Sequence, residues 1–434
     1  MRRLLLLLAL LLPAPAMAQD MPQILPLRER ARVQDAWLAE RLDVIVPRLM
    51  REQGFDMWVL IAREYLEGPV MTTMLDATSM RARRRTILVF YDPGGGRPAE
   101  RLTVSRYGLG GLFRPAWDPA TQPDQFARLA ALIAERNPRR IAVNVSPNTA
   151  FADGLTHSQY QALMTALPPR LRTRVAPTDE LAVGWLETRI PAEIARYPEI
   201  VRIAHRIIAE GFSGRTVRPG VTTADDLVWW YRERIAALGL DTWFHPSVEI
   251  FRRGSPQPLE GDAVIQPGDM LWTDFGITYL RLNTDTQQLA YVLRPGETDA
   301  PAGLRAGMAD ANRVQDGLLA SFRTGLSGNE ILAAALARAR AAGLRATIYS
   351  HPLGYHGHGA GASIGFWDNQ AADPRGTHRL RPDTAWSIEL NARRAVPEWD
   401  GQEIEFRLEE DAFFDGQRVS WIDGRQTQFH LIRR

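Results

Sequence analysis

The chain has 434 residues, of which 45% are hydrophobic and 24% are charged, as in ordinary globular proteins, so we expect at least two domains with sizeable cores. It contains no cysteine and no lysine, which excludes disulfides, a thiolate nucleophile, cysteine–zinc sites and a lysine Schiff base. The formal net charge of +2 would fall to zero if the first 18 residues, with two arginines and no acids, were removed. We therefore predict no net attraction to nucleic acid or to an anionic membrane.

Residues 1–18 have the three parts of a secretory signal peptide. Two arginines near the start precede an apolar run over residues 4–12, and small residues around Ala18 provide a cleavage site. About 20 apolar residues are needed to span a bilayer, so this run is too short. We predict cleavage near Ala18, a periplasmic or secreted protein, and no membrane span in the mature chain. The alternative is an uncleaved anchor.

Residues 19–185 are predicted to form a smaller α/β domain. Apolar residues at helical spacing predict a helix through positions 38–49, which Pro47 should kink or shorten and Gly54 should end. Apolar runs predict strands over 57–62, 86–91 and 141–145, and a further helix over 126–135. Because this half gathers no acids, histidines or phosphate-binding loop, we interpret it as structural or substrate-gating.

The domain boundary is predicted near residues 181–191, and residues 186–434 should form a second domain with two similar halves. Each half contains a pair of helices followed by a β-hairpin. The predicted helices cover 191–211, with a break expected at Pro198, then 224–238, 301–322 and 329–342. This order suggests an α+β domain with pseudo-twofold symmetry and a site at its centre, although the halves share no sequence match.

The first hairpin is predicted over residues 270–293, which have apolar ends and a more polar middle. With a turn near Tyr279 and Leu280, Asp274 and Asp285 would face each other with Cβ atoms about 5 Å apart. Like charges placed in this way destabilise a sheet unless positive charge lies between them. Two metal ions about 3.5–4 Å apart would supply that charge.

The second hairpin is predicted over residues 384–413, with its turn near Trp399. Glu389 and Glu409 lie at equal distances from Trp399 and would also face each other. The opposite faces of both strands carry a core pattern of apolar residues, namely Trp386, Ile388, Leu390, Ile404, Phe406 and Leu408. A single pair of opposed acids is usually a solvated face, but two pairs with histidines between them favour a metal site.

A glycine-rich segment between the hairpins contains His351, His356 and His358, three of the eight histidines of the chain. This density favours metal binding or proton transfer. His205 and His245 are isolated, and we predict that His205 lies on a helix surface.

Together these residues resemble the pita-bread metallopeptidase family, which includes methionine aminopeptidase, aminopeptidase P, prolidase and the metal-free relative creatinase. Asp274-Phe-Gly and the aspartate eleven residues later are similar to the first two ligands of that family. Ile-Glu389-Leu resembles its Ile-Glu-Pro glutamate, and Arg-Leu-Glu409-Glu resembles its Arg-x-Glu-Asp glutamate. Residues 19–185 also resemble the creatinase/prolidase amino-terminal domain, so the likeness covers nearly the whole mature chain.

The resemblance allows two positions for the histidine ligand. In one register His351 is the ligand and His358 takes the place of a catalytic histidine. In the other, Gly-His358-Gly-Ala-Gly is the ligand motif, and Gly365 then takes the catalytic position. We favour His351 because only the first register accounts for both histidines.

The resemblance thus implies a dinuclear metal site in which Asp274, Asp285, His351, Glu389 and Glu409 are the ligands. Such an oxygen-rich set suits Mn²⁺ and tolerates Co²⁺ or Zn²⁺. The implied enzyme is a Xaa-Pro aminopeptidase or Xaa-Pro dipeptidase that cleaves peptide bonds with a metal-bridging hydroxide. The resemblance also implies that Glu389 transfers protons and that His358 stabilises the tetrahedral intermediate. Its substrate would be a proline-containing peptide, and a homodimer would be consistent with the family.

One departure from the family concerns a further catalytic histidine, which usually lies 17 or 18 residues before the first aspartate. Here those positions are Gln257 and Pro256, and the usual Asp-x-Thr-Arg at the second ligand is Asp285-Thr-Gln-Gln. Two alternatives therefore stay open. The protein could be a metal-dependent hydrolase of a non-peptide amide, or a catalytically dead binding protein with a creatinase-like fold.

Overall fold

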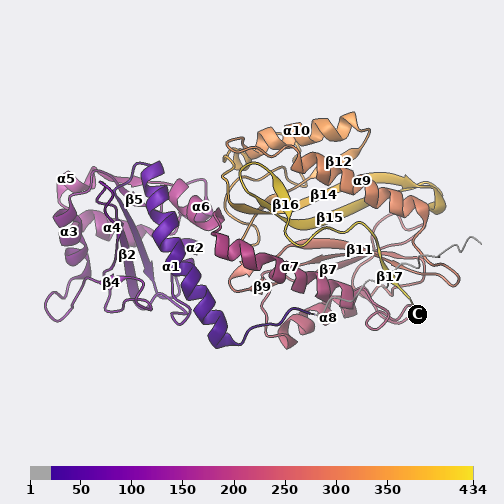
Figure 1. Cartoon of the computed structure of the whole chain (residues 1–434), viewed down its shortest axis with the longest axis horizontal. Coiled ribbons are helices and arrows are strands. Elements are labelled where there is room, and N and C mark those ends of the chain that lie inside the picture. Colours follow the sequence, from indigo (N-terminus) through magenta and orange to yellow (C-terminus); the bar gives the residue numbers. More distant parts are fainter. Residues whose placement is uncertain (1–20, 434) are drawn as a thin grey trace, which may run out of the picture.

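The structure, a computed structural model, describes residues 21–433, so the predicted signal peptide and its cleavage site lie outside the described part. The chain forms two lobes, each built around its own β-sheet (Figure 1). Among the described helices, none has an apolar stretch long enough to cross a membrane.

The N-terminal lobe contains a six-stranded sheet in the order β4-β3-β2-β1-β5-β6. Its strands are β1 (Met57–Arg63), β2 (Arg85–Tyr91), β3 (Glu100–Thr103), β4 (Arg114–Pro115), β5 (Ile141–Val143) and β6 (Val175–Pro177). Its helices are α1 (Leu27–Glu52), α2 (Pro69–Thr73), α3 (Gln125–Arg136), α4 (His157–Ala166), α5 (Pro169–Arg172) and α6 (Glu180–Glu187), with a 3₁₀ turn at Ala150–Ala152. The three predicted strands and the helix over 126–135 are confirmed, with small differences at their ends.

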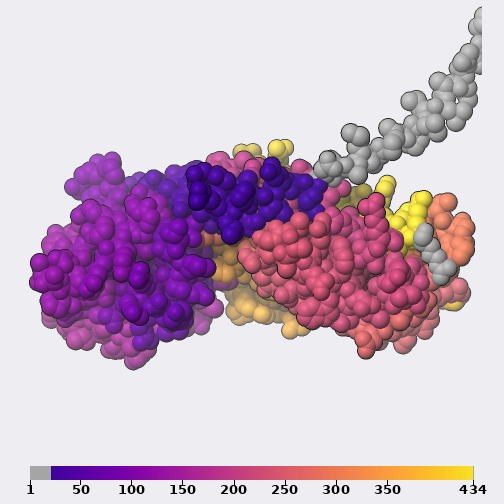
Figure 2. Space-filling view, turned by 90° about the horizontal axis from the view of Figure 1, so that it is seen from below, coloured from indigo at the N-terminus to yellow at the C-terminus, as the bar shows by residue number. Residues whose placement is uncertain are grey.

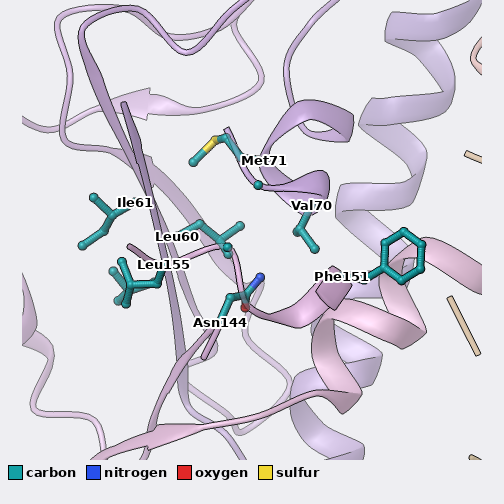
Figure 3. Close-up of a pocket in the computed structure, with 10 residues that line it drawn as sticks. Leu60, Ile61, Val70, Met71, Asn144, Phe151 and Leu155 are labelled. Atoms are coloured by element: carbon teal, nitrogen blue, oxygen red, sulfur yellow. The ribbon is translucent and has the colours of Figure 1, made fainter. Parts of the chain in front are cut away.

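Strand β1 is buried on both faces, which explains its continuous apolar sequence. Trp58, Leu60 and Ala62 join one core cluster, and Met57, Val59 and Ile61 join another. This alternation follows from the two-residue period of a strand. The lobe also encloses a cavity of about 10 Å³, lined largely by apolar side chains that include Leu60, Val70 and Phe151 (Figure 3). That volume holds at most about one water, so we regard the cavity as a packing defect.

The two prolines expected to interrupt helices do not do so. Helix α1 continues through Pro47 to Glu52, so this proline does not shorten it. Helix α7 (Pro191–Gly211) continues through Pro198, so the break predicted there is wrong. A proline removes one helical hydrogen bond at a cost of about 3 kcal/mol. Each buried aliphatic side chain contributes about 1.5–3 kcal/mol. Both helices bury apolar residues before and after the proline, which offsets the loss.

The C-terminal lobe contains a nine-stranded sheet whose main path is β12-β14-β15-β11-β8-β7. The strands are β7 (Ser247–Phe251), β8 (Met270–Phe275), β11 (Thr286–Val292), β12 (Arg345–Ile348), β13 (His351–Leu353), β14 (Thr384–Val396), β15 (Gln402–Phe414), β16 (Val419–Trp421) and β17 (His430–Ile432). A separate ladder joins β9 (Thr278–Tyr279) to β10 (Leu282–Asn283), and 3₁₀ turns occur at Pro374–Gly376 and Pro397–Trp399. The remaining helices are α8 (Ala224–Ala237), α9 (Ala302–Leu319) and α10 (Gly328–Ala341).

The helices cover this sheet from two sides: α9 and α10 on one side, α7 and α8 on the other (Figure 1). Helices α8 and α10 begin at capping boxes headed by Thr223 and Ser327. Helix α9 approaches β15 closely at Gly307, where a Cβ atom would lie 2.1 Å from the ring of Phe406. The predicted order of two helix pairs, each followed by a hairpin, is therefore present.

Helix α1 joins the two lobes, and Figure 2 shows it lying along both of them. Just before α1, the Leu25 backbone N–H donates to the Tyr279 hydroxyl, and within it Arg30 donates to the Gly239 carbonyl. The fully buried Arg41 guanidinium pairs with Glu193 of α7. One core cluster includes residues of both sheets. The domain boundary between residues 185 and 186 thus stays a prediction, and it falls within the last turn of α6, a few residues before α7 begins at Pro191.

Candidate metal centre

The first hairpin has a different register from the one predicted. Asp274 of β8 faces Gln287 of β11, so Asp285 is not its cross-strand partner. The turn is formed by Leu280 and Arg281, which have φ angles of 54° and 67°. Two successive positive φ values are typical of a type I′ turn, which usually has Asn or Gly there. Asp285 consequently lies in the connection between β10 and β11.

Asp285 nevertheless reaches the site from this connection. One oxygen of Asp285 lies within 4.8 Å of carboxylate oxygens of both Asp274 and Glu409. Its position is fixed by its own backbone N–H, which donates to Asp411 Oδ1 at 3.2 Å. The predicted proximity of the two aspartates is therefore present, although the predicted ladder geometry is wrong.

The second hairpin has the predicted register, with Glu389 of β14 directly opposite Glu409 of β15. Its predicted core face is also confirmed, because Trp386, Ile388 and Leu390 are fully buried under the C-terminal helices. Glu409 pairs in addition with Gln287 of β11. Asp274, Gln287, Glu409 and Glu389 therefore form one row across four adjacent strands, and residues paired in this way share a face of the sheet.

His351 begins strand β13 and closes the cluster. Its Nε2 lies 3.5 Å from Asp285 Oδ2, 3.8 Å from Glu389 Oε2 and 3.9 Å from Glu409 Oε1. Its Nδ1 lies 3.0 Å from the Pro352 carbonyl oxygen, which can only accept, so Nδ1 carries the proton. Burial, with a contribution from His358, lowers the pKa of His351 to about 3. A neutral imidazole whose Nε2 has no hydrogen-bond partner is thus directed at three carboxylates.

His358 lies beside this group and is more exposed. Its ring centroid is 4.8 Å from that of His351 and 5.1 Å from that of Trp243. One ring nitrogen of His358 lies within 4.8 Å of donor atoms of Asp285 and His351. Burial lowers the pKa of His358, so this imidazole is also neutral near pH 7. His351 therefore contacts three of the predicted acids, whereas His358 lies next to one.

The electrostatics of the cluster are unfavourable for four ionised acids. Burial raises the pKa of Asp274 to about 7, although Arg407 opposes the rise. Burial and mutual repulsion raise the pKa values of Asp285, Glu389 and Glu409 well above the ordinary range. Asp274 Oδ1 and Glu409 Oε2 are buried without a hydrogen-bond partner. A divalent cation would offset this charge, and the four carboxylates with one neutral imidazole are a donor set that fits such an ion.

Several residues for which the sequence predicts no role in the site hold the acids in place. Gln287 Nε2 donates to Glu389 Oε1 at 2.5 Å, and Trp272 Nε1 donates to Gln287 Oε1 at 3.2 Å, which fixes the orientation of the amide. Ser387 Oγ donates to Glu409 Oε1. Strand alternation predicts that Ser387 shares a face with Glu389, as the structure shows, but the contact between Gln287 and Glu389 joins residues far apart in sequence.

The prediction for His205 is wrong, because its ring lies in an ion-pair network and not on an open helix surface. Its Nε2 is 2.7 Å from Glu410 Oε2, and its Nδ1 is 3.3 Å from Asp423 Oδ2. Burial would lower the pKa of His205, but these two carboxylates outweigh it and raise the pKa to about 10. His245 is exposed and lies 3.0 Å from Arg232.

The positions where the family usually has a further histidine lie in the connection between β7 and β8. Pro256 and Gln257 line a cavity of about 240 Å³ together with Arg393 and Arg407. Within residues 21–433, the side-chain clusters able to hold a metal contain no histidine other than His351 and His358. Within the described residues, no third histidine therefore joins the candidate metal site, as the sequence predicts.

Acidic side chains and an imidazole that converge in this way are typical of metal-dependent enzymes. A comparison with protein families identifies which family this is. Residues 199–412 match the model of metallopeptidase family M24. The chain therefore belongs to this family through its C-terminal lobe, and the predicted two-domain α+β pita-bread fold is confirmed. This membership supports hydrolase activity. None of the curated proteins compared with the chain matches it significantly.

Solved structures of similar fold cover nearly the whole chain. An X-Pro aminopeptidase from Thermotoga maritima is 16% identical over 88% of this chain and 99% of its own, with a TM-score of 0.62. A Xaa-Pro dipeptidase from Bacillus anthracis is 18% identical over 94% of this chain and 100% of its own, with a TM-score of 0.55. Zinc-substituted aminopeptidase P from Escherichia coli is 13% identical over 93% and 97%, with a TM-score of 0.57. At these identities the likeness establishes the fold alone.

Proposed function

We propose that the protein is a metal-dependent exopeptidase of the Xaa-Pro aminopeptidase or Xaa-Pro dipeptidase type. The observation that carries this proposal is the convergence of three buried carboxylates, the half-buried Asp274 and a neutral imidazole, among which donor atoms are unpaired. Family membership makes a peptide the expected substrate. The preference for proline is supported by the fold shared with Xaa-Pro peptidases.

The donor atoms suggest two cation sites that share Glu409. Asp274, Asp285 and Glu409 would hold one ion, and His351, Glu389 and Glu409 the other. When bound, such divalent ions polarise a carbonyl oxygen and make water a stronger acid. The oxygen-rich set suits Mn²⁺, and Co²⁺ or Zn²⁺ would also fit. In this assignment His351 is the histidine ligand and His358 is free to contact the substrate.

The chain's own residues supply proton transfer and orientation. Glu389 would accept a proton from the attacking water and donate it to the leaving nitrogen. Gln287 donates a hydrogen bond to Glu389 and holds it in one orientation. His358 would donate a hydrogen bond to the carbonyl oxygen of the substrate as negative charge develops there.

The test is hydrolysis of Xaa-Pro dipeptides and of longer Xaa-Pro peptides by purified protein, with and without added Mn²⁺. We expect Mn²⁺-dependent release of the first residue. Cleavage of dipeptides alone would indicate the dipeptidase type, and cleavage of longer peptides the aminopeptidase type. Failure of the metal-loaded protein to cleave any of these peptides would contradict the proposal.

A second candidate is a hydrolase of a non-peptide amide on the same metal scaffold. The replacement of the usual histidine by Pro256 and Gln257 favours this second candidate, because a catalytic residue of the peptidases is changed while all five metal donors remain. Non-peptide amides assayed beside the peptides would distinguish the two. The predicted periplasmic or secreted location is also part of the proposal, and the N-terminal sequence of the mature protein tests it.

A further inference from the structure

The segment after β13, which carries His358, is held at Tyr355 by residues far from it in sequence. The Tyr355 hydroxyl donates to Glu193 Oε1 of α7 at 3.1 Å. The guanidinium carbons of Arg41 and Arg189 lie over the Tyr355 ring, 4.8 and 4.7 Å from its centroid. Both distances are within the range of cation–π attraction. Through Arg41 of α1, this tyrosine connects the segment to the N-terminal lobe.

The charged side chains around Tyr355 are fully buried and carry unequal charge. Burial alone would raise the pKa of Glu193, but Arg189 and Arg41 outweigh it and lower the pKa, so this carboxylate is ionised. Two cations therefore face one anion. Among the described residues, Arg189 Nη1, 3.5 Å from Glu193 Oε1, has no hydrogen-bond partner. The negative face of an aromatic ring stabilises such a desolvated cation, so the cluster is most stable with the Tyr355 ring in place.

The residues on either side of Tyr355 are held as well. The Gly354 carbonyl oxygen accepts from the backbone N–H of Asn283 at 2.9 Å and from its side-chain amide at 3.0 Å. The His356 ring lies 4.9 Å from the ring of Phe151, which belongs to the 3₁₀ turn of the N-terminal lobe. The N-terminal lobe thus contacts two successive residues of this segment.

The two histidines of the candidate metal centre depend on this segment to different degrees. His351 belongs to β13 and pairs with Ser387 of β14, so the sheet fixes its position. His358 lies five residues beyond Leu353, where β13 ends, and outside any strand. Its position therefore depends on the contacts of the segment, and the ligand His351 should be unaffected when those contacts are lost.

We propose that Tyr355 is a positioning residue through which the N-terminal lobe holds His358 against the substrate. Arg41 supplies the contact from that lobe, and Arg189 and Glu193 complete it. The kinetic consequence rests on the proposed exopeptidase function, in which His358 contacts the substrate. Misplacing a group by about 1 Å can lower a rate by about 100-fold, so a buried cluster behind the segment can control turnover.

Hydrogen exchange of the metal-free protein, followed by mass spectrometry, tests this positioning without catalysis. In wild-type protein we expect slow exchange over residues 354–360, where the Gly359 N–H donates to the Pro352 carbonyl at 2.8 Å. Tyr355→Leu should speed this exchange by about tenfold or more, because it removes a hydrogen bond to a charged group and both cation–π contacts. Tyr355→Phe keeps the ring and should stay closer to wild type.

Tyr91→Leu is the matched control. Tyr91 also donates to a carbonyl, that of Arg136, and has the guanidinium of Arg136 near its ring, but it lies on β2 of the N-terminal lobe. We expect this variant to leave the exchange of residues 354–360 unchanged. Exchange of the β14–β15 hairpin should be unchanged in both leucine variants.

A double-mutant cycle in peptide hydrolysis then shows whether Tyr355 acts through His358. We expect Tyr355→Leu to lower kcat by about tenfold with metal content unchanged. In a His358→Ala background the same change should alter kcat by less than about twofold, because the residue that Tyr355 positions is already gone. A purely structural role of Tyr355 would lower kcat in both backgrounds.

Fast exchange of residues 354–360 in wild-type protein, unchanged exchange in Tyr355→Leu, or equal losses of kcat in both backgrounds would overturn the proposal. If Tyr355→Leu does not fold, the wild-type and Tyr355→Phe exchange rates still decide. A segment loosened by Tyr355→Leu in a protein that cleaves no peptide would contradict the proposed function and support the positioning role. Peptide hydrolysis that Tyr355→Leu leaves unchanged would do the reverse.

Discussion

The two hairpins that carry the acids are built in different ways. The β14–β15 hairpin is a regular ladder of 13 residues in each strand, and pairing alone places Glu389 opposite Glu409. The β8–β11 hairpin is interrupted, and Asp285 lies in its connection. Its position depends on the hydrogen bond between its backbone and Asp411 of the other hairpin. The regular hairpin thus forms a template against which the irregular one is positioned.

The largest effect should come from removing the acid of the irregular hairpin. In Asp285→Ala we expect loss of bound metal and a fall of hydrolysis to background, because Asp285 contacts Asp274, Glu409 and His351. Metal analysis and peptide hydrolysis measure the two losses. Asp241→Ala, at an exposed position before β7, is the matched control. Unchanged metal content in Asp285→Ala would refute a role of this residue as ligand.

A smaller effect should follow from removing the support of Asp285. Asp411→Ala deletes the acceptor of the Asp285 N–H, and changes of this kind typically cost about 10–100-fold in metal affinity. Asp411→Asn keeps an oxygen at the same place and should lose little affinity. Competition with a metal chelator measures both variants. Equal affinities in the alanine and asparagine variants would show that the irregular hairpin does not depend on this contact.

Gln287 connects the two hairpins and should affect turnover more than metal binding. Gln287→Met keeps the volume but removes the donor to Glu389, so we expect kcat to fall by about tenfold with metal content unchanged. The matched control is Gln288→Met, because Gln288 points the other way and donates to Glu410. Steady-state kinetics of both variants provide the measurement. A similar loss of kcat in both would argue against orientation of Glu389 by Gln287.

His205 of α7, which pairs with Glu410 of β15, should make the stability of the protein depend on pH. The pKa of His205 is raised to about 10 in the folded protein, above its ordinary value near 6.5. The stabilisation by protonated His205 is therefore fully present below about pH 6.5 and is lost as pH rises towards 10. His205→Asn should destabilise the protein by about 1–3 kcal/mol at pH 6, and by less at pH 9. Denaturant unfolding at both pH values measures the difference, and a cost that does not vary with pH would contradict it.

The sequence predicts the regular parts of this molecule better than the irregular ones. The register of β14–β15 follows from alternation and a central turn, so Glu389 and Glu409 could be paired in advance. The turn at Leu280 and Arg281 has positive φ values without the usual Gly or Asn, so no local signal marked it. The partners of His205 lie more than 200 residues away in sequence, beyond the reach of any local pattern. The same reason hid the role of Gln287, whose contact with Glu389 forms only when the strands are assembled.

Two cations should lie between the hairpins, and anomalous diffraction from a crystal soaked in Mn²⁺ would locate them. We expect two anomalous peaks, one among Asp274, Asp285 and Glu409 and the other among His351, Glu389 and Glu409. The absence of any peak among these five side chains, with Mn²⁺ bound elsewhere or not at all, would contradict this expectation.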